Sequence, residues 1–172
     1  MRKAENKLDK TKTKFLTQGA MIAAIYVVLC LVFAPISYGE IQLRIAEALT
    51  ILPYFTPAAV PGLFVGCLIS NILGGGVILD VIFGSVATLI GAIGTRLLRN
   101  YSPFLAPVPP IAANMLIIPF VLYYGYGINA PIPIMMLTVG AGEVLGCGVL
   151  GLLLLFALKK TLNRNKTKKD IF

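Results

Sequence analysis

The chain has 172 residues, of which 58% are apolar, and its mean hydropathy is +0.88. A helix needs roughly 20 apolar residues to span a bilayer, so this composition argues against a single soluble core and allows about six membrane spans. The net charge of +8 is nearly confined to the two ends of the chain, which argues against a nucleic-acid partner. We therefore expect a polytopic membrane protein with one domain.

Apolar runs separated by proline, glycine and basic residues predict six helices in chain order. The second run is short and polar for a membrane span, so we expect part of it to line a cavity. The predicted spans are residues 15–33, 41–54, 58–73, 77–98, 104–125 and 132–158. The expected fold class is an all-α membrane protein, a bundle of six transmembrane helices, with a kink at Pro119.

Lysine and arginine gather before the first predicted span, after the last, and in the 96–102 break. Basic segments next to membrane spans remain in the cytoplasm. Both termini are therefore expected to be cytoplasmic, which agrees with an even number of spans. We predict a basic N-terminal tail (1–14), a transmembrane substrate-binding domain (15–160) and a basic C-terminal tail (161–172).

The chain has no histidine, and each of its three cysteines lies within an apolar run. The missing histidine excludes His-ligated metals, a Ser-His-Asp triad and an HExxH protease, and no phosphate-binding loop is present. We interpret Cys30, Cys67 and Cys147 as buried thiols rather than metal or redox groups. We expect a protein that is not an enzyme, has no cofactor or metal, and cannot hydrolyse ATP by itself.

Polar side chains in the outer half of the predicted bundle are the candidate binding residues. Four carboxylates and one guanidinium give this region a formal charge of −3. Charged groups at membrane depth must find a partner or a wet cavity. The candidates are Tyr38, Gln42, Arg44, Glu47, Asn71, Asp80, Asn114 and Glu143.

Helical spacing over residues 40–54 would place Glu40, Arg44 and Glu47 on one face. Arg44 and Glu47 could then pair with each other in a purely structural role. Pairing of Arg44 with one acid leaves the other outer carboxylates without a cation. Such groups bind protons or await a ligand, and we favour a ligand.

Glu143 is the most informative of these acids because it lies in mid-span among glycines that leave room beside it. A carboxylate can accept two parallel hydrogen bonds, and guanine-like bases offer such a pair at N1–H and the 2-amino group. Asn71 and Asn114 can donate and accept, which suits the carbonyl and ring nitrogens of a base.

Small residues four apart mark close helix contacts. Gly62-x-x-x-Gly66 and Gly142-x-x-x-Gly146 are expected to pack inside the bundle. At 18.4 kDa and without a visible internal repeat, the chain is small for a transporter that works alone. A binding subunit that takes its energy from a partner fits better.

Six short spans, Ala20-x-x-x-Ala24 and basic ends resemble the substrate-binding S components of energy-coupling-factor (ECF) transporters. More narrowly, QLRIAEALT, SNILGGG followed by LD and FGS, and GAGE resemble the QueT family of queuosine-precursor transporters over residues 15–160. The resemblance implies a 7-deazaguanine ligand, such as the 7-cyano or 7-aminomethyl compound or queuine, captured outside the bacterial cell membrane. It also implies that Ala20 and Ala24 contact a transmembrane T subunit, which works with two cytoplasmic ATPases.

On this resemblance, Glu143 would receive the N1–H and 2-amino hydrogens, with Asn114 or Asn71 near the opposite edge. Glu47 or Asp80 would face the substituent on the five-membered ring, and Arg44 would hold one outer carboxylate. Two alternatives remain open: an S component for another vitamin or nucleobase-like micronutrient, and a small autonomous membrane carrier.

Overall fold

The structure is a computed structural model that describes the backbone of residues 2–34 and 44–169 and the side chains of residues 9–34 and 44–164. Tyr38, Glu40 and Gln42 lie outside the described residues, so the roles expected of them stay predictions.

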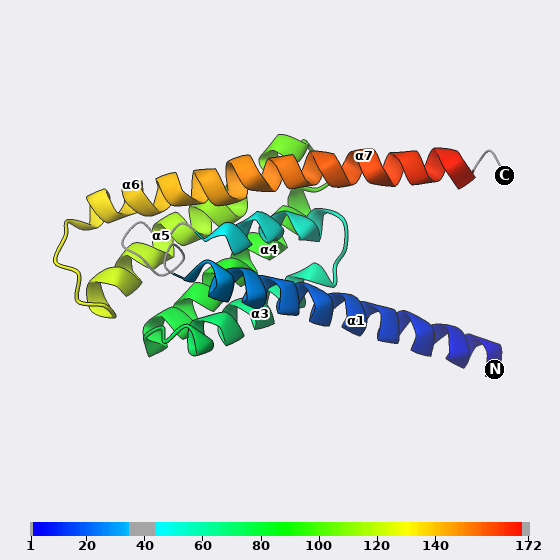
Figure 1. The fold of residues 1–172 in the computed structure, drawn as a ribbon, viewed down its shortest axis with the longest axis horizontal. Coiled ribbons are helices and arrows are strands. Elements are labelled where there is room, and N and C mark those ends of the chain that lie inside the picture. The colour runs from blue at the N-terminus through cyan, green and yellow to red at the C-terminus, as the bar shows by residue number, and fades with distance from the viewer. Residues whose placement is uncertain (1, 35–43, 170–172) are drawn as a thin grey trace.

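The described part of the chain is helical, with no strand (Figure 1). The helices are α1 (Arg2–Val32), η1 (Ile45–Tyr54), α3 (Ala59–Leu73), η2 (Asp80–Gly84), α4 (Ser85–Leu98), η3 (Pro103–Leu105), α5 (Val108–Tyr124), α6 (Ile132–Glu143), η4 (Val144–Leu150) and α7 (Gly151–Lys169). The segment η1 is a 3-10 helix, and η2 and η4 are π-helical. Figure 1 shows α6, η4 and α7 as one continuous helix, with both chain ends at the same end of the bundle.

Four helices among the described residues are long and apolar enough to cross a membrane. They are Asp9–Val32, Asp80–Leu98, Pro103–Tyr124 and Ile132–Arg164. Two further apolar helices, η1 and α3, have 10 and 15 residues. At 1.5 Å per residue α3 spans about 22 Å, short of the roughly 30 Å hydrocarbon core. Each of the six predicted segments therefore contains a helix among its described residues, and four of these helices have the length of a full span.

The surface of the bundle is apolar and its interior contains polar groups, the reverse of a soluble protein. Large apolar side chains point outward on every long helix, for example Leu16, Ile82, Leu116, Leu137 and Leu153. Buried polar residues are Arg44, Glu47, Asn71, Asp80, Asn114 and Glu143, each at most 7% exposed. An exposed apolar surface of this extent marks contact with membrane or protein.

Three boundaries differ from those the sequence predicted. Helix α1 begins at Arg2 and α7 continues to Lys169, so both basic tails extend membrane helices. Residues 2–18 and 159–169 contain no glycine or proline, and nothing in them interrupts a helix. The second helix begins at Ile45, and Arg44 before it is extended, with φ −87° and ψ 102°. The expected helical face shared by Arg44 and Glu47 is therefore wrong.

Helices α1 and α3 pack closely through glycine. A Cβ at Gly62 would lie 2.6 Å from the carbonyl oxygen of Gly19, and one at Gly66 would lie 3.0 Å from Cβ of Tyr26. The prediction that Gly62 and Gly66 pack internally is confirmed. On α1, Ala23 and Tyr26 are buried in this contact, whereas the side chains of Ala20 and Ala24 are exposed.

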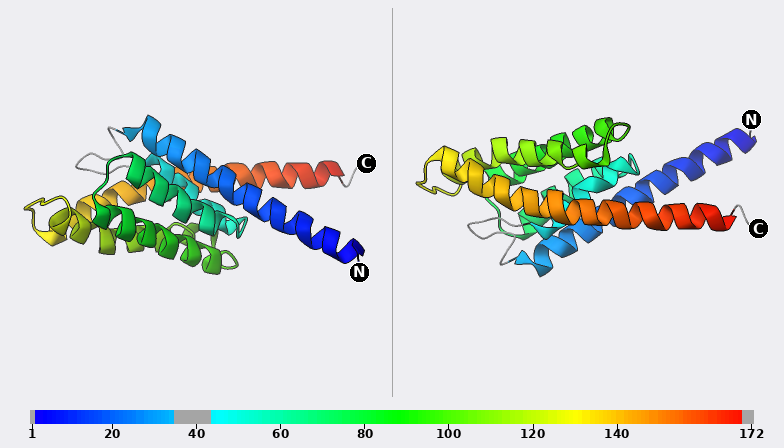
Figure 2. Two further views of the ribbon diagram at one scale, coloured as in Figure 1. Left: turned by 90° about the horizontal axis from the view of Figure 1, so that it is seen from below. Right: turned by 90° about the horizontal axis from the view of Figure 1, so that it is seen from above.

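Three apolar clusters hold the helices together around the polar interior, and the smallest packs Ile51 of η1 against Ala106 and Leu155. The two larger ones join different helices. One joins α1, η1, α3 and α4 around Tyr26, Leu63 and Cys67, and the other joins α5 to α6 around Ile118 and Met135. Cys30, Cys67 and Cys147 are free and buried, as the sequence predicted. Figure 2 shows α1 crossing the bundle at an angle to α6 and α7, with the 125–131 loop at the end opposite the termini.

Candidate functional site

The buried polar residues form two neighbouring groups. The first, which we call the Arg44–Asp80 cluster, contains the buried residues Arg44, Asn71 and Asp80 together with Tyr126, which is 38% exposed. Arg44 Nη2 lies 3.1 Å from Asp80 Oδ2 in a buried ion pair. The hydroxyl of Tyr126 donates to the same oxygen at 3.0 Å. Asn71 Nδ2 donates to the backbone carbonyl of Asp80 at 3.0 Å. The cluster therefore joins four segments far apart in the sequence.

Gly84 explains the spacing of the LD and FGS motif. A Cβ at Gly84 would lie 2.6 Å from Asp80 Oδ1 and 3.1 Å from Asn71 Nδ2. The missing side chain leaves the space that these two polar groups occupy. The residues of this motif therefore pack together around the buried carboxylate of Asp80.

Tyr126 belongs to the loop between α5 and α6, outside the membrane-spanning helices. Its partial burial, together with the negative Asp80 beside it, raises the pKa of Tyr126 to about 12. The phenol therefore stays protonated at neutral pH and can donate to the carboxylate.

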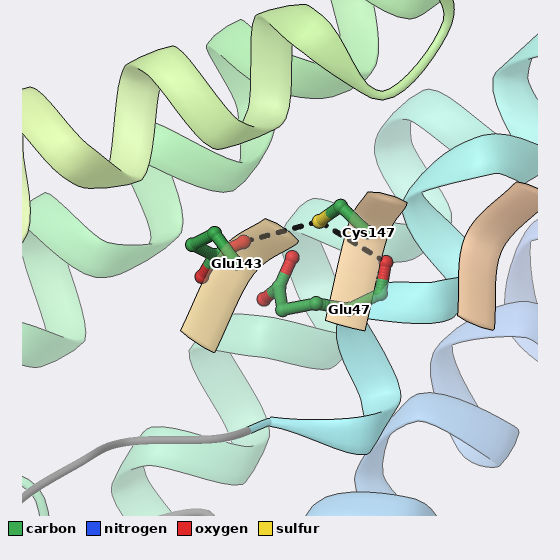
Figure 3. A group of neighbouring side chains, drawn as sticks. All are labelled: Glu47, Glu143 and Cys147. Carbon is green, nitrogen blue, oxygen red and sulfur yellow. Dashed lines mark hydrogen bonds between the residues drawn. The ribbon is translucent and has the colours of Figure 1, made fainter. Parts of the chain in front are cut away.

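The second group, the Glu47–Glu143 cluster, contains Glu47, Glu143 and Cys147 (Figure 3). One ligand atom of each residue lies within 4.8 Å of those of the other two. The hydroxyl of Tyr26 on α1 donates to Glu47 Oε1 at 2.5 Å. The thiol of Cys147 donates to Glu143 Oε2 at 3.0 Å. Figure 3 shows the two carboxyl groups facing each other.

Several buried polar atoms in and near these clusters have no hydrogen-bond partner among the described residues. They are Glu47 Oε2, Asn71 Oδ1, Asp80 Oδ1 and Asn114 Nδ2. Asn114 also lies close enough to Glu143 to interact with its carboxyl group. Buried polar atoms are nearly always satisfied in native proteins, so this concentration points to a ligand or water between them.

Both π-helical segments lie at this site. Asp80 is the first residue of η2, whereas Glu143 directly precedes η4 and Cys147 lies within it. Single π-helical turns inside α-helices occur frequently at functional sites. A Cβ at Gly146 would lie 3.1 Å from the carbonyl oxygen of Arg44, so η4 approaches the start of η1 closely.

The Glu47–Glu143 cluster has the donor types of a metal site, since two carboxylates and a thiolate can bind zinc. Two features favour an organic ligand instead. Arg44 lies near enough to act on both carboxyl groups, and its positive charge opposes a second cation. The Cys147 thiol is also engaged as a donor to Glu143.

The structure brings together six of the eight predicted site residues, since Tyr38 and Gln42 lie outside the described residues. Sequence reasoning missed Tyr26, Cys147 and Tyr126 as partners of the acids. Tyr26 could have been noticed in the sequence, because it lies in an apolar helix close to Ala24. A tyrosine hydroxyl buried there requires a hydrogen-bond partner.

Three aromatic residues lie at the surface, away from the buried polar groups. Phe83, Tyr123 and Tyr124 are 46%, 39% and 70% exposed. Phe83 and Tyr124 line an apolar groove of about 430 Å³ between η2 and α5. Their exposure fits interfacial anchors.

Comparison with known proteins agrees with this architecture. The family model described as QueT transporter matches residues 16–160. The chain is 36% identical over 85 residues to the queuosine precursor transporter QueT of Lactococcus lactis subsp. cremoris (strain MG1363). That match covers 48% of this chain and 50% of the relative, so the chain aligns with about half the length of the relative. No solved structure matches. The chain belongs to the QueT transporter family.

Proposed function

We propose that the chain is the substrate-binding subunit of an ECF-type importer that captures a queuosine precursor on the outer side of the bacterial cell membrane. The observation that carries this proposal is a buried polar site with unpartnered atoms inside a bundle whose surface is apolar. Membership of the QueT transporter family and the name of the Lactococcus relative support the substrate class.

The proposed topology has six helical segments and both termini in the cytoplasm. Both ends of the chain lie at one end of the bundle in Figures 1 and 2, and the basic residues gather at these ends. Helices η1 and α3 would enter the bilayer without crossing it fully. The short η1 then places Glu47 inside the bundle, where protein rather than lipid surrounds it.

In the proposed complex, Glu143 accepts the N1–H and 2-amino hydrogens of a 7-deazaguanine. Asn114 carries an unpartnered amide nitrogen near Glu143 and supplies a donor for the carbonyl of the base. Asn71 is engaged with Asp80, which makes Asn114 the better candidate for the ligand. Arg44 holds Asp80 in place.

The proposed partner surface lies on α1. Ala20 and Ala24 are exposed one turn apart, and Ala20 lines a shallow apolar groove with Leu16, Gly19 and Val65. Small residues allow another helix to approach closely. A transmembrane T subunit, coupled to two cytoplasmic ATPases, would dock here.

Ligand binding by the purified protein tests the proposed substrate. We expect thermal stabilisation by 7-cyano- or 7-aminomethyl-7-deazaguanine and none by riboflavin or biotin; the reverse pattern would defeat the assignment. Liposomes containing this chain alone should bind the ligand without accumulating it. Accumulation would instead favour an autonomous carrier.

Bulky substitutions on α1 test the proposed partner. Ala20→Trp and Ala24→Trp should abolish uptake in cells and leave ligand binding near normal, because a large side chain holds two helices apart. Ile25→Trp is a matched control, since Ile25 is 49% exposed on another face of α1. Equal loss of binding and uptake would show that the alanines pack inside the bundle.

A further inference from the structure

We propose that Glu47 and Glu143 together hold the single exocyclic amino group of the ligand, so that the site requires an unsubstituted 2-amino group. This inference rests on the proposed function and deepens it. It reassigns Glu47, which the sequence had left as a candidate for the substituent on the five-membered ring.

Glu47 and Glu143 lie too close together to contact opposite ends of one ligand. Their closest ligand atoms lie within 4.8 Å, and the two carboxyl groups face each other (Figure 3). In a 7-deazaguanine, the amino edge and the substituent on the five-membered ring lie at opposite ends of a flat bicycle. Two adjacent acids cannot contact both ends, so a ligand that contacts both Glu47 and Glu143 meets them with the same part.

A planar amino group is small enough for both acids to contact it. Its two N–H bonds diverge by about 120°, and hydrogen-bond acceptors lie about 2.9 Å from the nitrogen. Two such acceptors are then about 5 Å apart, slightly more than the 4.8 Å upper limit on the distance between one ligand atom of Glu47 and one of Glu143, so both carboxyl groups lie within reach of the same amino group. One amino group can therefore donate one hydrogen to each acid.

The neighbouring groups complete a pattern that matches a guanine-like edge. Glu47 Oε1 is held by Tyr26, which leaves the unpartnered Oε2 as an acceptor. Glu143 is the second acceptor and neighbours both Glu47 and Asn114, whose amide nitrogen is an unpartnered donor. Two acceptors and a donor complement the amino group, N1–H and carbonyl oxygen of the base.

Charge at the site agrees with a neutral amino group. Arg44 lies near enough to both carboxyl groups to offset part of their negative charge, in addition to its ion pair with Asp80. A ligand that binds here therefore does not need a cationic substituent. The two acids bind the amino group on the edge of the base.

A ligand series with the unaltered protein tests the proposal directly. Isothermal titration would compare 7-deazaguanine with its N2-methyl derivative and with 7-deazahypoxanthine, which lacks the amino group. We expect both analogues to bind at least roughly 100-fold more weakly, because a site built for N–H donors rejects a ligand without them. If Glu143 alone contacted this edge, the methyl group could point away. Binding of the N2-methyl compound within about threefold of 7-deazaguanine would therefore overturn the proposal.

Removing the Glu47 side chain should create room for the methyl group. In Glu47→Ala, we expect the preference for 7-deazaguanine over its N2-methyl derivative to fall at least roughly tenfold. Ile51→Ala, an equally buried truncation on the same helix whose side chain packs in a separate apolar cluster with Leu155, should keep the preference of the unaltered protein. An unchanged preference in a folded Glu47→Ala protein would refute the role of Glu47, and the ligand series decides if that variant does not fold. Absence of binding by every 7-deazaguanine would instead reject the proposed function itself.

Discussion

The Arg44–Asp80 cluster and the Glu47–Glu143 cluster both contain buried carboxyl groups, but the charged groups around these carboxyl groups differ. Asp80 forms an ion pair with Arg44 and accepts a further hydrogen bond from Tyr126. The phenol of Tyr26 donates to Glu47 and the thiol of Cys147 donates to Glu143, and both donors are neutral. Asp80 is thus paired directly with one cation, whereas Arg44 only offsets part of the charge of the adjacent acids Glu47 and Glu143, which can accept hydrogen bonds from a ligand.

The two clusters are also held by different parts of the molecule. The Arg44–Asp80 cluster ties the start of η1 to η2 and to the loop that carries Tyr126. The Glu47–Glu143 cluster lies deeper along η1 and is tied by Tyr26 to α1, the helix that exposes Ala20 and Ala24. The proposed ligand site and the proposed partner surface thus share one helix.

Breaking the ion pair should have the largest effect. Asp80→Ala leaves the buried guanidinium of Arg44 without its carboxylate, which costs about 3–5 kcal/mol of unfolding free energy. Thermal unfolding in detergent would measure the loss. A double variant that also replaces Arg44 with leucine should recover part of the stability, because the buried guanidinium is then removed together with its carboxylate partner. A single variant as stable as the unaltered protein would contradict the structural role of this pair.

Neutralising an acid in the other cluster should weaken ligand binding instead. Glu143→Gln keeps the shape of the side chain but turns one acceptor into a donor that faces the donors of the ligand. The expected loss is about 2–4 kcal/mol, or roughly 30- to 1,000-fold in affinity, with little change in unfolding temperature. An unchanged dissociation constant in the folded variant would remove Glu143 from the site.

Sequence reasoning predicted the helical segments and most of the polar site. Apolar periodicity and breaks predict where helices lie, and polar residues within apolar runs must turn inward. The partner of Arg44 could not be predicted because Asp80 is 36 residues away and the pairing depends on how the helices pack. The extended conformation of Arg44 was missed for a related reason: helical spacing assumes that the helix has already begun.

The difference between the two clusters could not be predicted from the sequence either. Sequence gives the number of acids but not their distances, so Glu47 and Asp80 were interchangeable candidates for one end of the ligand. Their separate environments follow from the start of η1, from Gly84, which makes room for Asp80, and from Gly146, which lets η4 approach. These contacts join segments that no local pattern connects.

Tyr26→Phe should have an intermediate effect, which is confined to the affinity for the ligand. The substitution removes the donor to Glu47 Oε1 and keeps the ring packed between α1 and α3. One buried hydrogen bond is worth about 1 kcal/mol, so we expect roughly fivefold weaker binding of 7-deazaguanine. Tyr126→Phe serves as the matched control and should leave affinity within about twofold. Equal losses in both variants would mean that the two clusters do not act separately.

The smallest effect is expected from the pH dependence of Tyr126. Its pKa of about 12 in the folded protein exceeds the ordinary value of 10, so the folded state retains the phenol proton after the unfolded chain has lost it. The stability that this proton contributes is complete below pH 10 and is lost as pH rises from 10 to about 12. Unfolding curves of the unaltered protein and Tyr126→Phe should run parallel from about pH 6 to about pH 9. Above pH 10 the unaltered protein should lose stability relative to the variant. A divergence already at neutral pH would show that a group other than this phenol causes the difference.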